Sequence, residues 1–345
     1  MFEISEEERN EDNVEGEIMH YYAGIDVGGT KIYAVVMNEE GQILGRAKVK
    51  TGAKTDFDII LEKILACYQN ACQDSGVNEA DIPAIGLAVP SSIDRVQRVI
   101  KHAPNLGWIN LKFSETLTTA FKKPFFVDND VNMGVFGEYH LGAGKGYKSV
   151  YGMFVGTGIG GGYVFDGQIV RGVNYTGGEI GHTIIKMGGL RCKCGNRGCL
   201  ETIAAKVGMI RYMKKQIDRR GKVSSIGKFA PDWRQSVGSS ALRKAFQKRD
   251  EVVVKALKRS AHAIGIAAAN VISTAGVEAI VIGGGVVEEL SSFFMPAIKK
   301  SMHKHAFAEG ANDVALLQSK LGDDAVALGA AWFVRLPEKQ DMLFR

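Results

Sequence analysis

The chain contains the same strand and turn pattern twice. Residues 24–44 read GIDVGGTKIYAVVMNEEGQIL, and residues 152–170, about 130 positions later, read GMFVGTGIGGGYVFDGQIV. Each copy has an apolar strand, a glycine-rich turn, a second apolar strand and a tight turn that ends in Gly-Gln-Ile. An internal repeat of this kind predicts a fold made of two similar halves, because each copy forms the same supersecondary unit.

The segments around the repeat predict further strands and helices from apolar runs and helical periodicity. Strands are expected at residues 22–27, 31–37, 42–50, 85–89, 125–127, 151–155, 161–165, 168–171 and 279–282. Helices are expected at residues 56–75, 132–140, 201–220, 239–275 and 324–334, with a loop at 128–132. Strands interleaved with helices in two halves predict two α/β domains with a cleft between them.

The distribution of charge and apolar residues indicates a globular cytoplasmic protein. The first 20 residues are acidic, where a signal peptide would be basic and then apolar, and they predict a disordered tail. The most apolar long run, residues 263–287, is interrupted by Asn270, Glu278 and three glycines, so it fits a buried helix and strand better than a membrane span. The 43 basic and 38 acidic side chains are intermixed, and their net charge of +5 does not indicate a nucleic-acid partner.

Glycine-rich turns at strand ends predict a phosphate-binding site, because glycine lets backbone N–H groups come close to an anion. The candidate residues are Asp26, Gly28, Gly29, Thr30 and Lys31, then Gly156, Thr157, Gly158 and Gly160, and finally Gly283, Gly284 and Gly285. Asp26 is also a candidate for holding Mg²⁺ through water. One such turn alone could be a plain hairpin, whereas two loops that face each other can hold a triphosphate from both sides. The chain has no Gly-x-x-x-x-Gly-Lys-Ser/Thr string, which argues against a P-loop.

Three cysteines and one histidine indicate a metal site. The spacing His-x9-Cys-x-Cys-x4-Cys is formed by His182, Cys192, Cys194 and Cys199. Three thiolates and one imidazole are a closed tetrahedral ligand set for zinc, and no fifth donor is evident, so the zinc is predicted to be structural. The alternative is that three cysteines share one loop by chance. Cys67 and Cys72 fall in a helical stretch and are interpreted as inert thiols.

Together these motifs resemble the ROK family of sugar kinases and sugar-responsive repressors. The resemblance covers about residues 22–335 and rests on residues 26–31, Pro104-Asn105-Leu106 with Trp108, Asp128-Asn129-Asp130-Val131-Asn132, residues 156–162, Gly178-Glu179-Ile180-Gly181-His182, the cysteines, and Gly198-Cys199-Leu200-Glu201. It implies an α/β fold of duplicated ribonuclease-H-like (actin-like ATPase) domains. It also implies a glucokinase-like transfer of the ATP γ-phosphate, with Mg²⁺, to the 6-hydroxyl of a hexose, and a homodimer or higher homo-oligomer.

The resemblance also assigns roles to single residues. Asp130 matches the general base, which accepts the hydroxyl proton of the sugar during phosphoryl transfer. The family's sugar contacts match Asn105, Asn129, Asp130, Glu179, His182 and Glu201. His182 would then place one ring nitrogen on zinc and the other on a sugar hydroxyl.

The residues around Asp130 give an independent reason for its assignment. It precedes a predicted helix, and a carboxylate near a helix N-terminus stays ionised, as a base must. The alternative is that Asp128 or Asp130 only caps that helix. Many family members have Gly-Pro-Gly where this chain has Pro90-Ser91-Ser92, so the hexose is left open, with glucose as the default.

We expect a small α/β domain at residues 21–131 plus 322–336 and a large one at 132–321, with the zinc-binding loop at 182–199. Two other interpretations remain. One is a ROK regulator, but the acidic residues before Tyr22 are too few and too polar for a DNA-binding domain, and the basic residues between 211 and 258 are interpreted as a solvated helix face. The other is a non-catalytic sugar-binding protein, against which Asp130 and the phosphate loops argue.

Overall fold

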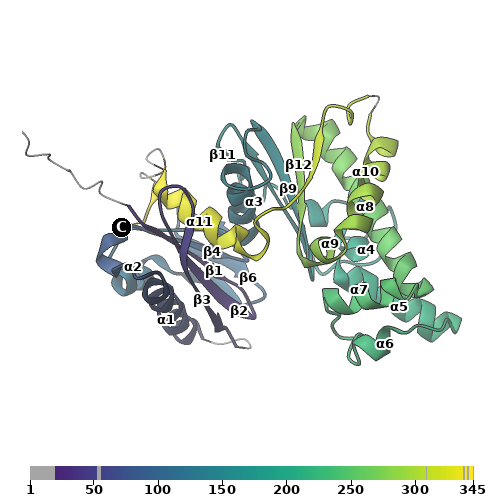
Figure 1. Ribbon diagram of the computed structural model, residues 1–345, viewed down its shortest axis with the longest axis horizontal. Helices are drawn as coiled ribbons and strands as arrows, with labels where there is room; N and C mark the ends of the chain where they lie inside the picture. The colour runs from purple at the N-terminus through teal and green to yellow at the C-terminus, as the bar shows by residue number, and fades with distance from the viewer. Residues whose placement is uncertain (1–19, 53–55, 308, 337–338, 340–341, 345) are drawn as a thin grey trace, which may run out of the picture.

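The computed structural model describes residues 20–52, 56–307, 309–336, 339 and 342–344. The predicted acidic tail, apart from His20, lies outside the described residues. The described chain contains two five-stranded sheets and one three-stranded sheet, with helices packed on the large sheets (Figure 1).

The first sheet holds the first copy of the repeat and has the order β3-β2-β1-β4-β8. Strands β1 to β3 pair antiparallel, while β4 and β8 run parallel to β1. The strands are β1 (Tyr22–Val27), β2 (Lys31–Met37), β3 (Ile43–Lys50), β4 (Ile85–Val89) and β8 (Phe125–Asn129). Its core is formed with α1 (Phe57–Ser75) and α2 (Ser114–Phe121).

The second sheet holds the second copy and has the order β11-β10-β9-β12-β13. Its first three strands are antiparallel, and β12 and β13 run parallel to β9, as in the first sheet. The strands are β9 (Ser149–Val155), β10 (Ile159–Phe165), β11 (Gln168–Ile169), β12 (Ala279–Gly283) and β13 (Ala315–Gln318). The glycine turns of the repeat therefore join corresponding strands, β1 to β2 and β9 to β10.

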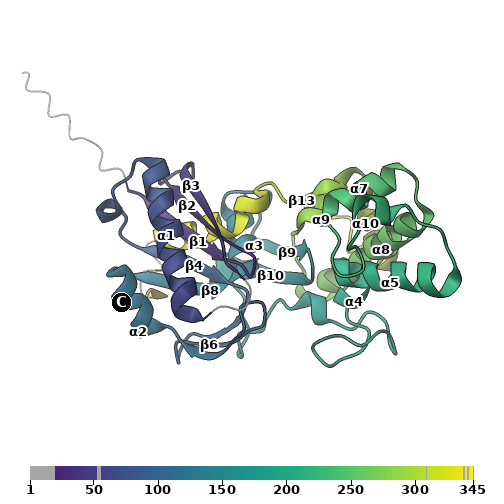
Figure 2. The same cartoon turned by 90° about the horizontal axis from the view of Figure 1, so that it is seen from below.

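Most helices lie on the far side of the second sheet from the first sheet (Figure 2). They are α4 (Glu201–Ala204), α5 (Lys206–Arg220), α6 (Ile226–Phe229), α7 (Ser239–Gln247), α8 (Glu251–Ala275), α9 (Gly285–Glu289) and α10 (Ser291–His305). The long helix α8 is buried along one face because apolar residues recur at helical spacing, and Asp250 caps it by accepting the Val252 and Val253 N–H groups.

Two helices join the sheets. The C-terminal helix α11 (Ala325–Arg335) lies against the N-terminal strands and against α3 (Asp130–His140), as Figure 1 shows. Glycines permit this approach: a Cβ on Gly24 would lie 1.9 Å from the Ala327 carbonyl oxygen, and one on Gly329 would lie 1.8 Å from that of Met133. Side chains of β8, α3, β10 and α11 share one apolar cluster, so the first turn of α3 is fixed relative to both sheets.

The structure corrects the sequence-based elements in several places. The predicted loop at 128–132 is the end of β8 and the start of α3. The predicted helix at 201–220 is divided at Ala205 into α4 and α5, and the predicted helix at 239–275 is broken at residues 248–250. Several elements were not predicted from the sequence: α2, α6, α9, α10, β13 and the small sheet of β5 (Ser92–Asp94), β6 (Val99–Ala103) and β7 (Trp108–Lys112). None of the helices within the described ranges combines the length and apolarity that a membrane span requires.

Candidate active site

The first glycine turn lies between β1 and β2 and contacts a predicted sugar-binding residue. The Gly28 N–H donates to the Lys31 carbonyl oxygen at 2.9 Å, which closes the turn. A Cβ on Gly29 would lie 3.0 Å from both the Cβ and the carbonyl oxygen of Asn105, in the turn between β6 and β7. The Lys31 ammonium lies 2.9 Å from Asp323 in an exposed ion pair, so a phosphate would have to compete with that carboxylate.

Asp26 and Asp130 are two carboxylates close to strand ends of the first sheet. Asp26 lies in β1 and Asp130 is the first residue of α3. Burial raises the pKa of Asp130 to about 6; the Val131 N–H, 2.9 Å from Oδ1, opposes this rise and Glu179 adds to it. Burial raises the pKa of Asp26 to about 7, and the charge on Asp130 contributes to that rise.

The environment of Asp130 changes one expectation from the sequence. A helix N-terminus lowers the pKa of a carboxyl group, but here burial outweighs the helix dipole. Asp130 does not cap α3, because the side chain of Asn129 accepts the Asn132 N–H at 3.1 Å. Asn129 also donates to the Ser91 carbonyl oxygen at 3.2 Å. The carboxylate of Asp130 is thus available for another partner.

Asp128 forms a buried ion pair that the sequence analysis did not find. Its Oδ2 accepts from Nε and Nη2 of Arg171 at 2.7 and 2.5 Å, and its Oδ1 accepts the Asn129 N–H at 2.7 Å. The side chains of Arg171 and Asp128 are only 12% and 5% exposed. Arg171 follows β11, so this pair connects the second sheet to the residue that caps α3.

The second glycine turn lies against the start of α3. The Gly156 N–H donates to the Gly158 carbonyl oxygen at 2.9 Å. A Cβ on Gly160 would lie 2.4 Å from Val131 Cγ2, and one on Gly158 would lie 2.4 Å from Glu201 Oε2. A Cβ at Gly160 would push Val131 and one at Gly158 would displace the Glu201 carboxylate, so the turn lies between the helix of Asp130 and a predicted sugar contact.

The third glycine cluster follows β12, next to β9 in the second sheet. Gly284 has φ +91° and a Cβ there would lie 2.5 Å from the backbone of Val155, so the chain passes directly over the end of β9. A Cβ on Gly285 would lie 3.4 Å from the Ser239 hydroxyl oxygen. The structure thus places Gly283–Gly285 one strand away from the turn of Gly156–Gly160.

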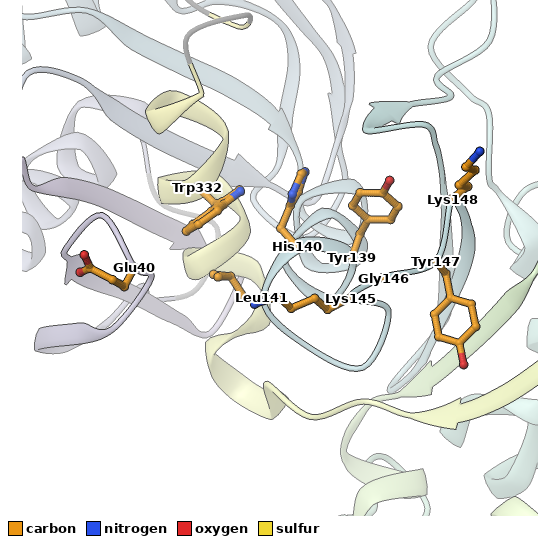
Figure 3. A pocket seen from close by; sticks show the side chains of 9 residues that line it. All are labelled: Glu40, Tyr139, His140, Leu141, Lys145, Gly146, Tyr147, Lys148 and Trp332. Atoms are coloured by element: carbon orange, nitrogen blue, oxygen red, sulfur yellow. The ribbon is translucent and has the colours of Figure 1, made fainter.

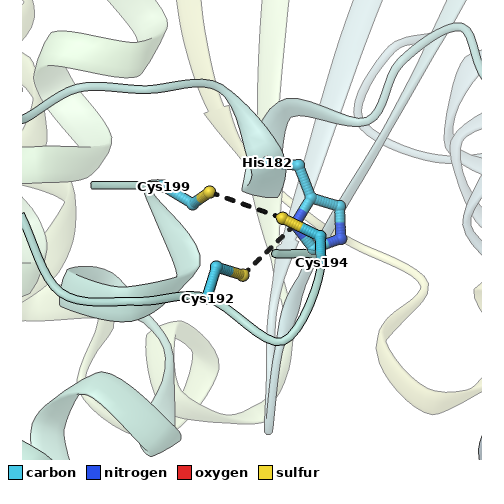
Figure 4. Close-up of side chains that lie close together, drawn as sticks. All are labelled: His182, Cys192, Cys194 and Cys199. Atoms are coloured by element: carbon cyan, nitrogen blue, oxygen red, sulfur yellow. Dashed lines mark hydrogen bonds between the residues drawn. The ribbon is translucent and has the colours of Figure 1, made fainter. Parts of the chain in front are cut away.

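The predicted metal ligands converge on one point (Figure 4). The ligand atoms of His182, Cys192, Cys194 and Cys199 all lie within 4.8 Å of one another. The Sγ atoms of Cys194 and Cys199 are 3.7 Å apart, and Cys192 Sγ is 3.6 Å from His182 Nδ1. Tetrahedral zinc with its usual bond lengths requires about 3.8 Å between two sulfurs and about 3.6 Å between sulfur and nitrogen, so this donor set fits zinc.

The metal ligands are close to two predicted sugar contacts. Glu201 Oε1 lies 3.9 Å from Cys192 Sγ, and its Oε2 accepts the Ile159 N–H at 3.2 Å. Glu179 is an exposed residue, but burial of its carboxyl group raises the pKa of that group. The charge on Glu201 adds to this rise in pKa, and His182 opposes it. His182, Glu179 and Glu201 therefore lie near one another and near the second glycine turn.

Two features lie apart from these residues. A hollow of about 430 Å³ at the C-terminal end of α3 is lined by rings of Tyr139, His140 and Trp332 (Figure 3), and it contains none of the predicted site residues. Cys67 and Cys72 are buried, and burial raises the pKa of each thiol to about 11, which fits their interpretation as inert thiols.

The mixed α/β fold with its glycine turns is shared by proteins of known structure. A ROK family glucokinase from Streptomyces griseus, solved in complex with glucose and AMPPNP, matches with a TM-score of 0.77 and 29% identity, over 90% of this chain and 98% of that chain. The ROK family model matches residues 22–336, and the chain belongs to the ROK family.

The curated relatives include both kinases and regulators. A glucokinase of Halalkalibacterium halodurans is 32% identical over 319 residues, which cover 92% of this chain and 96% of the relative. The xylose repressor of Bacillus subtilis is 26% identical over 317 residues, which cover 91% of this chain and 77% of the repressor.

Proposed function

We propose that this chain is an ATP-dependent hexose kinase that phosphorylates the 6-hydroxyl, with glucose as the default substrate. The position of Asp130 carries the proposal. This carboxyl group begins α3, neighbours Asp26, and lies beside the glycine turn that packs on Val131. A general base needs a pKa near the working pH, and a pKa of about 6 meets that need.

In the proposed reaction, Asp130 accepts the proton of the hexose 6-hydroxyl. The hydroxyl oxygen bonds to the γ-phosphorus while the bond from that phosphorus to the β–γ bridging oxygen breaks, which releases ADP. We assign the phosphate groups to the glycine turns of residues 28–31 and 156–160, with Gly283–Gly285 on the nucleoside side. Backbone N–H groups in such turns stabilise negative charge without moving during the reaction.

Mg²⁺ and zinc have separate parts in this proposal. Asp26 would hold Mg²⁺ through water, and the ion would neutralise charge on the phosphates. Partial burial raises the pKa of Asp26 and of Asp130, and the charge on Asp130 adds to the rise for Asp26. A cation between the two carboxylates would offset both costs. Zinc on His182 and the three cysteines would fix the orientation of the imidazole ring without taking part in the chemistry.

The sugar would contact Asn105, Asn129, Glu179, His182 and Glu201. We propose that the halves form two domains with the boundaries given above, and that their cleft closes on the substrates and excludes water. A cytoplasmic homodimer is part of the same proposal and rests on the family resemblance.

A sugar-responsive regulator is the second candidate, because the xylose repressor matches over most of this chain. The half-buried Asp130 beside the glycine turns favours the kinase, since a sensor needs no general base. The test is ADP release from ATP and Mg²⁺ across a panel of hexoses and N-acetylhexosamines. The kinase proposal expects hexose-dependent ADP release; sugar binding without ADP release, together with salt-dependent binding to duplex DNA, would favour the regulator.

A further inference from the structure

Lys206 is a half-buried cation without a counter-ion. It is the first residue of α5, and within the described ranges no hydrogen bond or ion pair involves its ammonium group. Lys31 in the first glycine turn, by contrast, is paired with Asp323. Burial lowers the pKa of Lys206, which means that its environment disfavours the charged form.

The position of this lysine adds a second electrostatic cost. The N-terminal end of a helix carries partial positive charge, so a cation in the first turn is repelled. Lys215 on the same helix is exposed, and its charge is therefore solvated. An anion near the ammonium group of Lys206 would offset both costs.

The backbone connects Lys206 directly to the second glycine turn. The Lys206 N–H donates to the Gly156 carbonyl oxygen at 3.1 Å, and the Val207 N–H donates to that of Thr157 at 3.4 Å. Because the backbone of Lys206 is hydrogen-bonded to the turn, its flexible side chain begins next to the turn. The carboxylate of the nearby Glu201 already accepts the Ile159 N–H, and no carboxylate within the described ranges lies at ion-pair distance from Lys206.

We propose that the ammonium group of Lys206 binds the phosphate groups of the nucleotide, next to the glycine turn of residues 156–160. This inference rests on the proposed kinase function and adds a cationic contact to it. The anion must be the nucleotide, because the hexose is neutral and a magnesium ion would be repelled.

The test compares three variants with the wild-type protein. Lys206→Met removes the charge and keeps the apolar stem, Lys206→Arg keeps the charge, and Lys215→Met is the matched control on the exposed face of α5. The probes are a non-hydrolysable ATP analogue with Mg²⁺ and, separately, adenosine, both measured by calorimetry without sugar. Steady-state kinetics give the KM for ATP and for the hexose.

We expect Lys206→Met to weaken binding of the ATP analogue and to raise the KM for ATP about 10- to 100-fold, as expected for a charge-assisted contact. Adenosine binding and the KM for the hexose should not change, Lys206→Arg should retain most of the affinity, and Lys215→Met should behave as the wild type. Without nucleotide, Lys206→Met should melt at a higher temperature than the wild type, because the cost of the unpaired charge is removed.

Two results would overturn the inference about Lys206 and leave the kinase proposal intact. The first is wild-type affinity of Lys206→Met for the ATP analogue. The second is a loss of adenosine affinity in Lys206→Met as large as its loss of ATP-analogue affinity, which would mean that Lys206 only shapes the turn. If the wild-type protein binds no ATP analogue, the kinase proposal and this inference fail together. The adenosine measurement and the wild-type control therefore distinguish the two failures.

Discussion

The buried ion pair between Arg171 and Asp128 gives the sharpest prediction about stability. Replacing Arg171 by Met keeps much of the side-chain volume but leaves the carboxylate of Asp128 buried and short of two hydrogen bonds. Removing one partner of a buried pair costs about 3–5 kcal/mol of folding free energy, because the remaining charge is not solvated. The exposures of 12% and 5% place this pair in the buried class.

The matched control is the exposed pair of Arg234 and Asp218, whose nitrogen and oxygen are 2.7 Å apart and whose side chains are 49% and 44% exposed. Arg234→Met should cost about 1 kcal/mol or less, because water screens the charges. Urea titrations followed by circular dichroism give both free energies of unfolding. The double variant with Asp128→Asn removes both charges and should cost less than the sum of the single changes.

The ion pair of Arg171 and Asp128 should also influence catalysis through Asn129. Asp128 accepts the Asn129 N–H, and the side chain of Asn129 caps the helix that begins with Asp130. We therefore expect Arg171→Met to lower kcat more than it raises the KM for ATP. If Arg171→Met costs no more stability than Arg234→Met, the argument from burial is refuted.

Three further predictions concern the site itself. The kcat should rise with pH through about 6 as Asp130 ionises, and an acid limb of the rate profile far from pH 6 would contradict the assignment of Asp130 as the base. Because folding raises the pKa of Asp130 from 3.8, its contribution to stability is present below about pH 4 and is lost as the pH rises through about 6. Gly160→Ala should lower kcat about 10- to 100-fold by pushing Val131 and the first turn of α3, whereas Gly227→Ala, which meets only an ordinary contact, should be neutral; equal kinetics in both variants would exclude the close packing. Removal of zinc with a chelator should make residues 182–199 sensitive to proteolysis and weaken hexose binding before ATP binding, and full hexose affinity of the metal-free protein would make zinc irrelevant to the pocket.

Local sequence signals predicted much of this protein. The strand pairs of the repeat and the cysteine spacing are short-range features, and the structure confirms the strands at residues 22–27 and 31–37 and the convergence of the four ligand atoms. The break before α8 also carried a readable signal, the capping residue Asp250.

Other features could not be read from short-range patterns. The small sheet of β5 to β7 has short strands, and non-glycine residues, Arg98 and Asn110, take positive φ values of 55° and 50° where a glycine would mark a turn. Asp128 lies in β8 of the first sheet and Arg171, 43 positions later, follows β11 of the second sheet. The isolation of Lys206 depends on which side chains surround it, and that is a property of the folded chain alone.

The most direct test of the account compares Asp130→Asn with the wild-type protein in two assays. Hexose binding is measured by calorimetry, and hexose-dependent ADP release is measured with saturating ATP and Mg²⁺. We predict that Asp130→Asn binds the hexose with near wild-type affinity while its turnover falls at least about 100-fold, because only the proton acceptor is lost. Near-normal turnover in Asp130→Asn, or a wild-type protein that binds hexose and releases no ADP, would contradict it.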